Sequence, residues 1–229
     1  MTRSIRIVKI GGNVVNNPDA LASFLADFVK LPGQKILVHG GGREATRLSA
    51  ALGIETTMIN GRRVTDRETL DVVTMVYAGL VNKRIVAALQ ALGCDAIGLS
   101  GADADVIRAT RRPATPVDFG YVGDIDDEDV AESVLAMLLR NGLTPVFCAI
   151  THDRQGQLLN CNADSVAAAV ACAASRIHPA SLIYCFEKPG VLSDADDDNS
   201  VISLITPENY ASLRESGAVS GGMIPKIDN

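Results

Sequence analysis

Glycines gather at three places where an apolar run of the sequence ends. They lie in "KIGGN" (9–13), "HGGGRE" (39–44) and "LSGAD" (99–103). A glycine cluster between a strand and a helix is either a tight turn or a place where the backbone approaches a ligand closely. Where such a turn opens a helix, the free N–H groups at the start of the helix can bind an anion. Several such turns at one edge of a sheet would suit a ligand with more than one anionic group.

Charged and amide side chains accompany these glycines. Arg63 in "NGRRVTD" and Lys226 in "GGMIPK" could each be a solvated surface charge. Lys9 differs, because it lies inside the apolar run "IRIVKIGG", where a charge is costly without a partner. Asn160, Asn162 and Asp164 form a polar cluster in "NCNAD", although capping of the following helix by Asn162 explains part of it equally well.

Several chemistries are disfavoured by what the sequence lacks. It contains no G-x-x-x-x-G-K-[ST] motif and no G-x-G-x-x-G after a predicted strand, so neither a P-loop nor the usual dinucleotide site is expected. The three histidines have no H-E-x-x-H spacing, and we expect no metal bound by the chain's own side chains. A net charge of -6, no block of Lys and Arg, and no Trp disfavour nucleic acid as a partner.

The N-terminal segment and the cysteines predict a cytoplasmic protein. The N-terminal "MTRSIRIVKIGG" resembles neither a signal peptide nor a membrane span, and no membrane association is expected. The five cysteines form no C-x-x-C pair and lie mostly in apolar surroundings. Buried reduced thiols are therefore favoured over disulfides.

Short runs rich in Val and Ile alternate with helical patterns, and these elements must position the motifs. The runs are typical of parallel strands covered on both faces, and they occupy 5–10, 35–40, 95–101, 144–150 and 181–187. Helices are predicted to start at Asn17 and Pro18, at a capping box over 65–68 with an end near Gly93, and at Thr206. The predicted fold is a three-layer αβα sandwich with a mainly parallel open sheet.

Two polar stretches interrupt the alternation and predict β-hairpins, one within 106–125 and one at 152–158. In an open α/β sheet, ligands bind beyond the carboxyl ends of the strands. Gly11, Gly40 and Gly101 all follow strand ends, so they should line one rim of the sheet.

Six motifs occur in the same order as in a known family. They are "KIGGN", "VHGGG", "NGRRVT", "LNCNAD", "GVL" and "GGMIPK", and together they extend over essentially all 229 residues. On these motifs the chain resembles the amino acid kinase family and, within it, the acetylglutamate kinases. The combination of "RRP…VDFGYVGDI" with "YCFEKPGVL" is similar to the branch found in Bacteroidetes-type bacteria.

The resemblance implies that ATP, carrying Mg²⁺, phosphorylates the γ-carboxylate of N-acetyl-L-glutamate in arginine biosynthesis. Such a transfer needs positioning and neutralisation of charge more than covalent chemistry. The implied catalytic residues are Lys9, Lys226 and Asp164, with the aspartate holding both lysines. The implied acyl-glutamate site contains Gly41, Gly42, Arg63 and Asn160. The implied phosphate and nucleotide site contains Gly11, Gly12, Glu187, Lys188, Gly190, Val191, Leu192, Ala218, Val219 and Ser220.

The resemblance also implies a single domain over 1–229. An acyl-glutamate lobe with the dimer interface is expected over about 1–175, and an ATP lobe over about 176–229. Members of the family continue beyond the equivalent of Asn229, so the ATP lobe is expected to be incomplete at its C-terminus. Arginine-inhibited members carry an N-terminal helix that links dimers into hexamers, and a first strand beginning at Ile5 leaves no residues for it. A homodimer is therefore expected.

Alternatives remain open at this stage. N-succinyl-L-glutamate could replace the acetylated substrate, with Arg108, Arg111 or Arg112 meeting the extra carboxylate, although these arginines could equally be solvated. A nucleotide-binding regulatory protein without catalysis is a second alternative, disfavoured because Lys9, Asp164 and Lys226 are all present. Many members of the family carry Asp where this chain has Glu187 and a small residue where it has Lys188, so nucleotide contacts there could differ.

Overall fold

Five strands form one parallel sheet, and each arises from an apolar run that the sequence places there. The computed structural model describes residues 4–59, 61–194, 196–219 and 223–228. Every pairing in this sheet is parallel, and the strand order is β11 (Ala180–Cys185), β1 (Ile5–Ile10), β2 (Gln34–His39), β8 (Thr144–Phe147) and β5 (Ala96–Leu99). Buried Ile, Val and Leu side chains dominate β1 and β2, as expected for strands covered on both faces.

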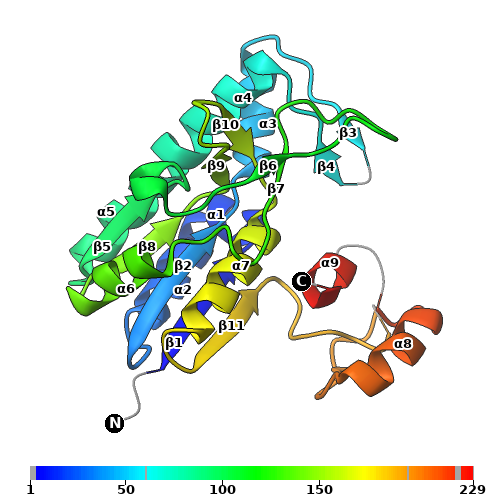
Figure 1. Ribbon diagram of the computed structural model, residues 1–229. Helices are drawn as coiled ribbons and strands as arrows, with labels where there is room; N and C mark the ends of the chain where they lie inside the picture. Colours follow the sequence, from blue (N-terminus) through cyan, green and yellow to red (C-terminus); the bar gives the residue numbers. More distant parts are fainter. Residues whose placement is uncertain (1–3, 60, 195, 220–222, 229) are drawn as a thin grey trace. The chain divides into compact units, whose positions relative to one another are not determined.

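Helices cover both faces of this sheet (Figure 1). On one face, α7 (Ala163–Ser175) packs against β1 and β11, and α6 (Glu132–Arg140) packs against β8. On the other face, α5 (Asn82–Ala91) packs against β5 and β8 and contacts α2 (Pro18–Phe28), while α1 (Gly12–Asn16) contacts both α2 and α3 (Gly42–Ala51). The three-layer αβα prediction is therefore confirmed.

Helix starts follow capping chemistry, with one correction. Asn17 accepts hydrogen bonds from Asp19 N and Ala20 N and caps α2, as predicted. The predicted capping box at Thr65 is wrong, because Asp66 caps α4 (Arg67–Thr74) by accepting from Thr69 N. The Thr65 hydroxyl is engaged elsewhere: it donates to Arg63 O and accepts from an amide at the site described below.

The helix that follows Asp66 changes its winding. It continues from α4 through a π-helical segment, η1 (Met75–Val81), into α5. By length and composition alone, the combined helix over 67–91 is long and apolar enough to cross a membrane. However, Val72, Val73 and Ile85 are buried in the same hydrophobic core as the sheet, as in a core helix of a globular domain.

Short hairpins rise from the carboxyl side of the strands. The predicted excursion within 106–125 contains β6 (Thr110–Arg111) paired antiparallel with β7 (Gly123–Asp124), and the predicted hairpin near 152–158 contains β9 (Ile150–His152) and β10 (Leu158–Asn160). A third pair joins β3 (Met58–Ile59) to β4 (Arg62–Arg63), and a 3₁₀ turn, η2, spans Asp103–Asp105. The three hairpins carry residues of the site.

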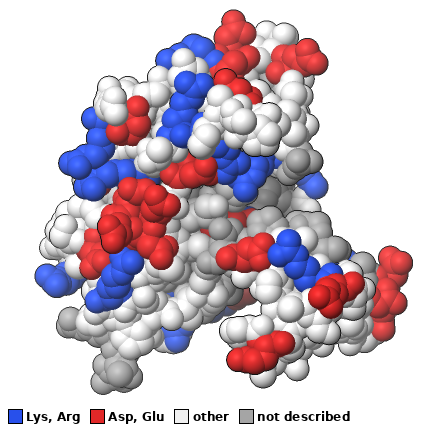
Figure 2. All heavy atoms as spheres, turned by 45° about the vertical axis from the view of Figure 1, so that its right-hand side comes forward, with Lys and Arg blue, Asp and Glu red and all other residues white. Residues whose placement is uncertain are grey.

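The chain divides into two compact units, 1–185 and 186–229. The first contains the sheet and its covering helices. The second contains α8 (Pro207–Glu215) and α9 (Ile224–Asp228). Thr206 and Asn209 form a reciprocal capping box at the start of α8, as the sequence predicts for Thr206. On the face shown in Figure 2, basic and acidic side chains are interspersed, so this face carries both signs of charge.

Candidate active site

The glycine turns after β1 and β2 lie next to each other at one rim of the sheet. Gly11 and Gly40 follow the parallel strands β1 and β2, and Gly40 N donates to Ile10 O at 3.4 Å. Gly101 follows β5 at the same edge, since all five strands run in one direction. The prediction that these glycines line one rim is confirmed.

The turn after β2 opens α3 without a side-chain cap. Gly41 is the N-cap residue of this ten-residue helix, and no side chain accepts a capping hydrogen bond there. A Cβ at Gly41 would lie 2.7 Å from Cδ1 of Tyr77, whereas a Cβ at Gly42 would meet nothing closer than 3.9 Å. Of these two glycines, Gly41 is thus required by the packing of the chain itself, and the N-terminus of α3 offers backbone N–H groups to an anion.

Beside this turn lies a cavity of about 170 Å³. The hairpin β3–β4, the helix segment η1, strand β10 and the start of α7 all contribute to its wall. Its lining consists of Gly42, Met58, Gly61, Arg62, Arg63, Tyr77, Val122, Asn160, Cys161 and Asn162. The predicted acyl-glutamate residues Gly42, Arg63 and Asn160 therefore meet in one cavity although they are far apart in sequence.

Arg63 is a buried cation held by uncharged oxygens. It is 8% exposed, and its guanidinium donates to Thr56 Oγ1 at 3.2 Å, to Gly42 O at 3.0 Å and to Thr46 Oγ1 at 2.8 Å. Among the described residues, no carboxylate lies within ion-pair distance of Arg63. A buried charge of this kind calls for an anionic partner, and a carboxylate matches its planar geometry.

Asn160 reaches the cavity from β10. Its Nδ2 donates to Thr65 Oγ1 at 3.0 Å, and its side chain is buried. This bond, together with the donation from Thr65 to Arg63 O, connects Asn160 to the segment that carries Arg63. The sequence predicts Thr65 as part of a helix cap. The spacing of that motif does not indicate that the Thr65 hydroxyl also links Asn160 to the segment of Arg63.

Lys9 and Asp164 form a buried ion pair in the first unit. Lys9 Nζ lies 2.7 Å from Asp164 Oδ1, and each side chain is 10% exposed. Asp164 stands in the first turn of α7, where the helix dipole favours a carboxylate. Asn162 caps that helix by accepting from Asp164 N at 2.7 Å and also lines the cavity.

Tyr184 adds a hydroxyl group to this end of the sheet. It is the register partner of Lys9 across β1 and β11. Burial and, to a smaller extent, the nearby Asp164 carboxylate together raise the pKa of Tyr184 to about 12, so its phenol keeps its proton. Sequence reasoning did not find this residue, because a tyrosine in an apolar strand gives no functional signal by itself.

The three arginines considered for a succinyl group all have partners in the chain. Arg108 pairs with Asp105 at 3.0 Å, Arg111 with Asp118 at 3.4 Å, and Arg112 with Asp124 at shorter range. Arg62 instead lines the cavity. Burial lowers the pKa of Arg62 from its ordinary value, and the charge of Arg112 lowers it further.

The second unit carries the predicted nucleotide residues other than Gly11 and Gly12, which lie in the first unit. Gly190 packs closely on Val201, since a Cβ there would lie 2.9 Å from its Cγ1, and Leu192 forms a β-bridge with Val201. Val191 O accepts from Ile202 N at 2.8 Å. Val219, which follows α8 and Ala218, is 1% exposed, while Ser220 lies outside the described residues. Lys226 is on α9.

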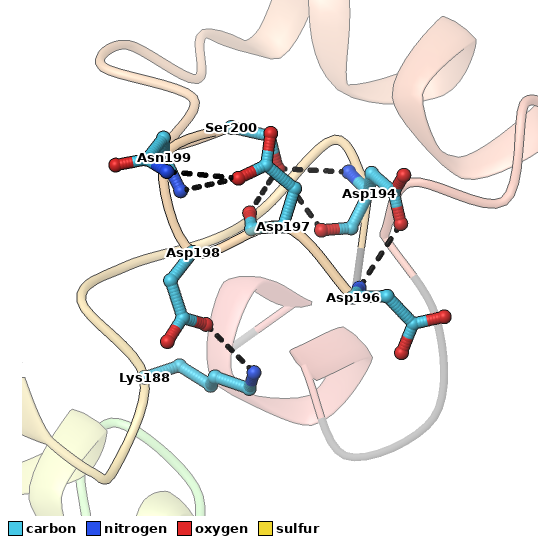
Figure 3. A network of polar contacts seen from close by, with 7 residues as sticks. All are labelled: Lys188, Asp194, Asp196, Asp197, Asp198, Asn199 and Ser200. Carbon is cyan, nitrogen blue, oxygen red and sulfur yellow. Dashed lines mark hydrogen bonds and ion pairs between the residues drawn. The ribbon is translucent and has the colours of Figure 1, made fainter.

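An acidic loop over 194–199 provides the partner of Lys188 (Figure 3). Lys188 Nζ lies 2.7 Å from Asp198 Oδ1, and this hydrogen bond raises the pKa of the lysine. Around this loop Ser200 Oγ donates to Asp194 O, and Asp197 Oδ1 accepts from Asn199 N. Glu187, the neighbour of Lys188, leads from β11 into this unit.

The cysteines remain free thiols, as predicted. Cys94, Cys148 and Cys161 are buried, and Cys172 and Cys185 are partly buried. Burial raises the pKa of Cys161 to about 12, although its Sγ lies in the wall of the cavity, 3.0 Å from Thr151 Oγ1. This thiol is therefore a poor nucleophile.

An open parallel αβα sheet with glycine turns, a buried lysine and a buried arginine at one rim defines a phosphoryl-transfer type of site without a P-loop. The family model described as "Amino acid kinase family" matches residues 4–229. The chain belongs to the amino acid kinase family.

Individual relatives are similar over the whole chain. A protein of Phocaeicola vulgatus named acetylglutamate kinase is 54% identical over 229 residues, which are 100% of this chain and 88% of that protein. A Bacteroides thetaiotaomicron protein of the same name is 51% identical with the same coverage. Among solved structures, smu.665 from Streptococcus mutans UA159 has a TM-score of 0.79 and 27% identity over 98% of this chain and 87% of its own.

Proposed function

We propose that this protein transfers the γ-phosphoryl group of ATP to the γ-carboxylate of N-acetyl-L-glutamate, giving an acyl phosphate in arginine biosynthesis. Relatives at 50–54% identity are named acetylglutamate kinase. The observation that carries the proposal is the buried Arg63, which lines a cavity beside the uncapped start of α3 and whose partners among the described residues are uncharged oxygens. An amino acid with two carboxylates supplies one anion for Arg63 and one for the glycine turn.

Each residue of the rim has a role in this proposal. Arg63 binds the α-carboxylate, and Asn160 binds the amino acid as well. The N–H groups of Gly41 and Gly42 orient the attacking γ-carboxylate, and those of Gly11 and Gly12 face the phosphoryl oxygens. Because these donors belong to the backbone at strand ends, they are oriented before the substrate arrives.

The cations act on the charge that develops during transfer. Negative charge spreads over the phosphoryl oxygens as the bond to ADP breaks and the bond to the γ-carboxylate forms. Lys9 neutralises part of this charge from the acyl-glutamate side, and Asp164 fixes the position of its ammonium. Lys226 is proposed to act from the nucleotide side, as the second cation held by Asp164.

The nucleotide is proposed to bind to the second unit through Glu187, Lys188, 190–192 and 218–220. Among the described residues, no group of three or more His, Cys, Asp and Glu side chains is arranged to hold a metal ion. Mg²⁺ would therefore enter with the phosphates of ATP, where it neutralises their charge. The lobes are proposed to follow this division of labour, with acyl-glutamate on about 1–175 and ATP on about 176–229.

Arg62 favours N-succinyl-L-glutamate as a second candidate substrate. It lines the same cavity as Arg63, and no carboxylate among the described residues is paired with it, in contrast to Arg108, Arg111 and Arg112. A succinyl group would bring a third carboxylate to this second guanidinium.

We also propose a cytoplasmic homodimer. The long helix over 67–91 leaves apolar side chains exposed, with Met75 at 53%, beside an open cavity that contains Leu70 and Leu158. A second copy of the chain would cover this surface, because a two-fold contact places the same patch on both partners. Light scattering on the purified protein tests this: a mass of about twice 24.1 kDa supports it, and a monomer contradicts it.

A coupled ADP-release assay with a panel of acceptors tests the reaction. N-acetylglutamate and N-succinylglutamate should support turnover, whereas glutamate, aspartate and UMP should not. The ratio of kcat/KM between the two acyl-glutamates, measured with Arg62→Ala beside the wild type, decides which acyl group is native. If Arg62→Ala lowers kcat/KM for N-succinylglutamate alone, N-succinylglutamate is the native substrate. If the wild type turns over neither acyl-glutamate, the proposed function is contradicted.

A further inference from the structure

His39 is a fully buried histidine that stands directly before the glycine turn. It is the last residue of β2 and has no exposed surface. Its Nδ1 lies 2.8 Å from Gly40 O, and its Nε2 lies 3.1 Å from Nδ2 of Asn82. A carbonyl oxygen can only accept a hydrogen bond, so Nδ1 carries the proton and Nε2 accepts from the amide.

Asn82, the first residue of α5, completes the network from the opposite side. Its Nδ2 also donates to Val146 O at 2.9 Å, and its Oδ1 accepts from Lys83 Nζ at 3.1 Å. Lys83 donates in turn to Gly98 O at 3.0 Å. The side-chain polar atoms of His39 and Asn82 are therefore satisfied, and the network connects β2, β8, β5 and α5.

Strand β5 leaves room for this network. A Cβ at Gly98 would lie only 1.9 Å from Oδ1 of Asn82, so a larger residue at that position would displace the amide. The π-helical segment η1 ends immediately before Asn82, and π-helical turns change which side chains point inward. The same segment places Tyr77 against Gly41 of the glycine turn.

His39 keeps one protonation state over the working pH range. Burial lowers its pKa to about 4, and the nearby charge of Lys83 also lowers it, whereas the hydrogen bond to Gly40 O opposes this shift. At neutral pH the ring is uncharged, and the tautomer with the proton on Nδ1 is the one that both partners require.

The ring fixes the direction of a single peptide group. In a trans peptide the C=O of one residue and the N–H of the next point in opposite directions, because the group is planar. Holding Gly40 O against the ring therefore turns the N–H of Gly41 away from it. Gly41 is the uncapped N-cap residue of α3, whose N–H groups are the proposed anion donors.

We propose that His39 is a positioning residue that orients the Gly41 N–H toward the reacting carboxylate and phosphoryl group, while Asn82 stabilises the fold around the ring. This inference rests on the proposed function. It predicts that the bond from His39 to Gly40 matters for turnover, while the bond to Asn82 matters for stability. A purely structural network would not separate these two effects.

Two substitutions at one position separate the two bonds. In His39→Asn the side-chain amide occupies the place of Nδ1, so it can still donate to Gly40 O but does not reach Asn82. In His39→Gln the amide occupies the place of Nε2, so it reaches Asn82 and leaves Gly40 O without its donor. Thermal unfolding is measured for both, together with kcat and KM for ATP and acyl-glutamate.

We expect both variants to lower the melting temperature. The loss of kcat should be about 10- to 100-fold for His39→Gln and under about 5-fold for His39→Asn, with both KM values nearly unchanged, as for partners that orient a reacting group. Thr144→Val serves as a control. Thr144 is a buried polar residue that accepts a hydrogen bond from Cys94 Sγ, and it begins β8, away from the strand end that contacts Asn82. It should lose stability and keep kcat.

A second readout is independent of turnover. The chain has three histidines, so a long-range ¹H–¹⁵N NMR spectrum can resolve His39. We expect a neutral ring protonated on Nδ1 that does not titrate between about pH 5.5 and 8.5, where an ordinary histidine does. Equal kcat losses in the two His39 variants, unchanged kcat in His39→Gln, or a ring protonated on Nε2 would each overturn the inference. Absence of acyl-glutamate phosphorylation by the wild type would instead overturn the proposed function.

Discussion

Removing one member of the Lys9–Asp164 pair should destabilise the protein, and removing both should not. The two charged atoms lie 2.7 Å apart, and each side chain is 10% exposed. A single substitution removes the partner 2.7 Å from a buried charge, which typically costs about 3–5 kcal/mol. In a chain of this size that corresponds to a fall in melting temperature of roughly 6–20 °C. When both charges are absent, neither member of this pair remains to be buried without the other.

The variants are Lys9→Met, Asp164→Asn and the double substitution. We expect the double variant to melt at a higher temperature than either single variant, which requires a coupling free energy larger than the cost of one single substitution, that is, above about 3–5 kcal/mol. Turnover should behave differently. Loss of the Lys9 ammonium should lower kcat by about 10²–10³-fold, as for one preorganised donor, and the double variant should not recover it.

Calorimetry and a coupled ADP assay at saturating substrates measure the two effects. The exposed pair Lys30–Asp27, at 2.9 Å with side chains 73% and 75% exposed, is a matched control. Lys30→Met and Asp27→Asn should change stability by less than about 1 kcal/mol and leave kcat unaltered. Additive stability losses at Lys9 and Asp164, or turnover restored in the double variant, would refute this reasoning.

Four further substitutions probe the rim and the second unit. Gly41→Ala should lower both melting temperature and kcat because its Cβ would collide with a buried ring, while Gly42→Ala should keep the melting temperature and lose kcat; unchanged stability in Gly41→Ala would contradict the packing argument. Cys161→Ser should keep most activity, and because burial raises the pKa of Cys161 to about 12, thiol reagents should modify it slowly at pH 8; a loss above about 100-fold in kcat would assign the thiol a larger role. Lys188→Ala, which frees Asp198, should raise the KM for ATP and spare kcat, and the reverse pattern would contradict the nucleotide placement.

The strands could be predicted because a strand covered on both faces needs a run of apolar residues, which is visible in a short stretch of sequence. Near-continuous Val and Ile runs such as 5–10 are needed where both faces of a strand are covered, and β1 occupies that range. The start of α2 followed from Asn17 and Pro18 for the same reason, since capping depends on neighbouring residues only. The glycine rim was predictable because glycines after parallel strands must lie at one edge.

Other features depend on contacts that no local pattern encodes. Thr65 could cap a helix, but its hydroxyl instead donates to Arg63 O and accepts from Asn160 Nδ2. Asp66 caps the helix. The change from α-helical to π-helical winding at Met75 is marked by no proline in the segment Met75–Val81. A lysine inside an apolar strand indicates that Lys9 needs a partner, but the sequence does not name it. The packing of α7 on β1 brings Asp164 to Lys9.

Capture of the acyl phosphate tests the central claim most directly. The protein is incubated with ATP, magnesium and N-acetyl-L-glutamate in the presence of hydroxylamine, which converts an acyl phosphate into a stable hydroxamate. We predict hydroxamate and ADP in equal amounts, formed by the wild type and reduced by about 10²–10³-fold in Lys9→Met. ADP release without hydroxamate, or equal hydroxamate formation by Lys9→Met, would contradict transfer to the γ-carboxylate at this rim.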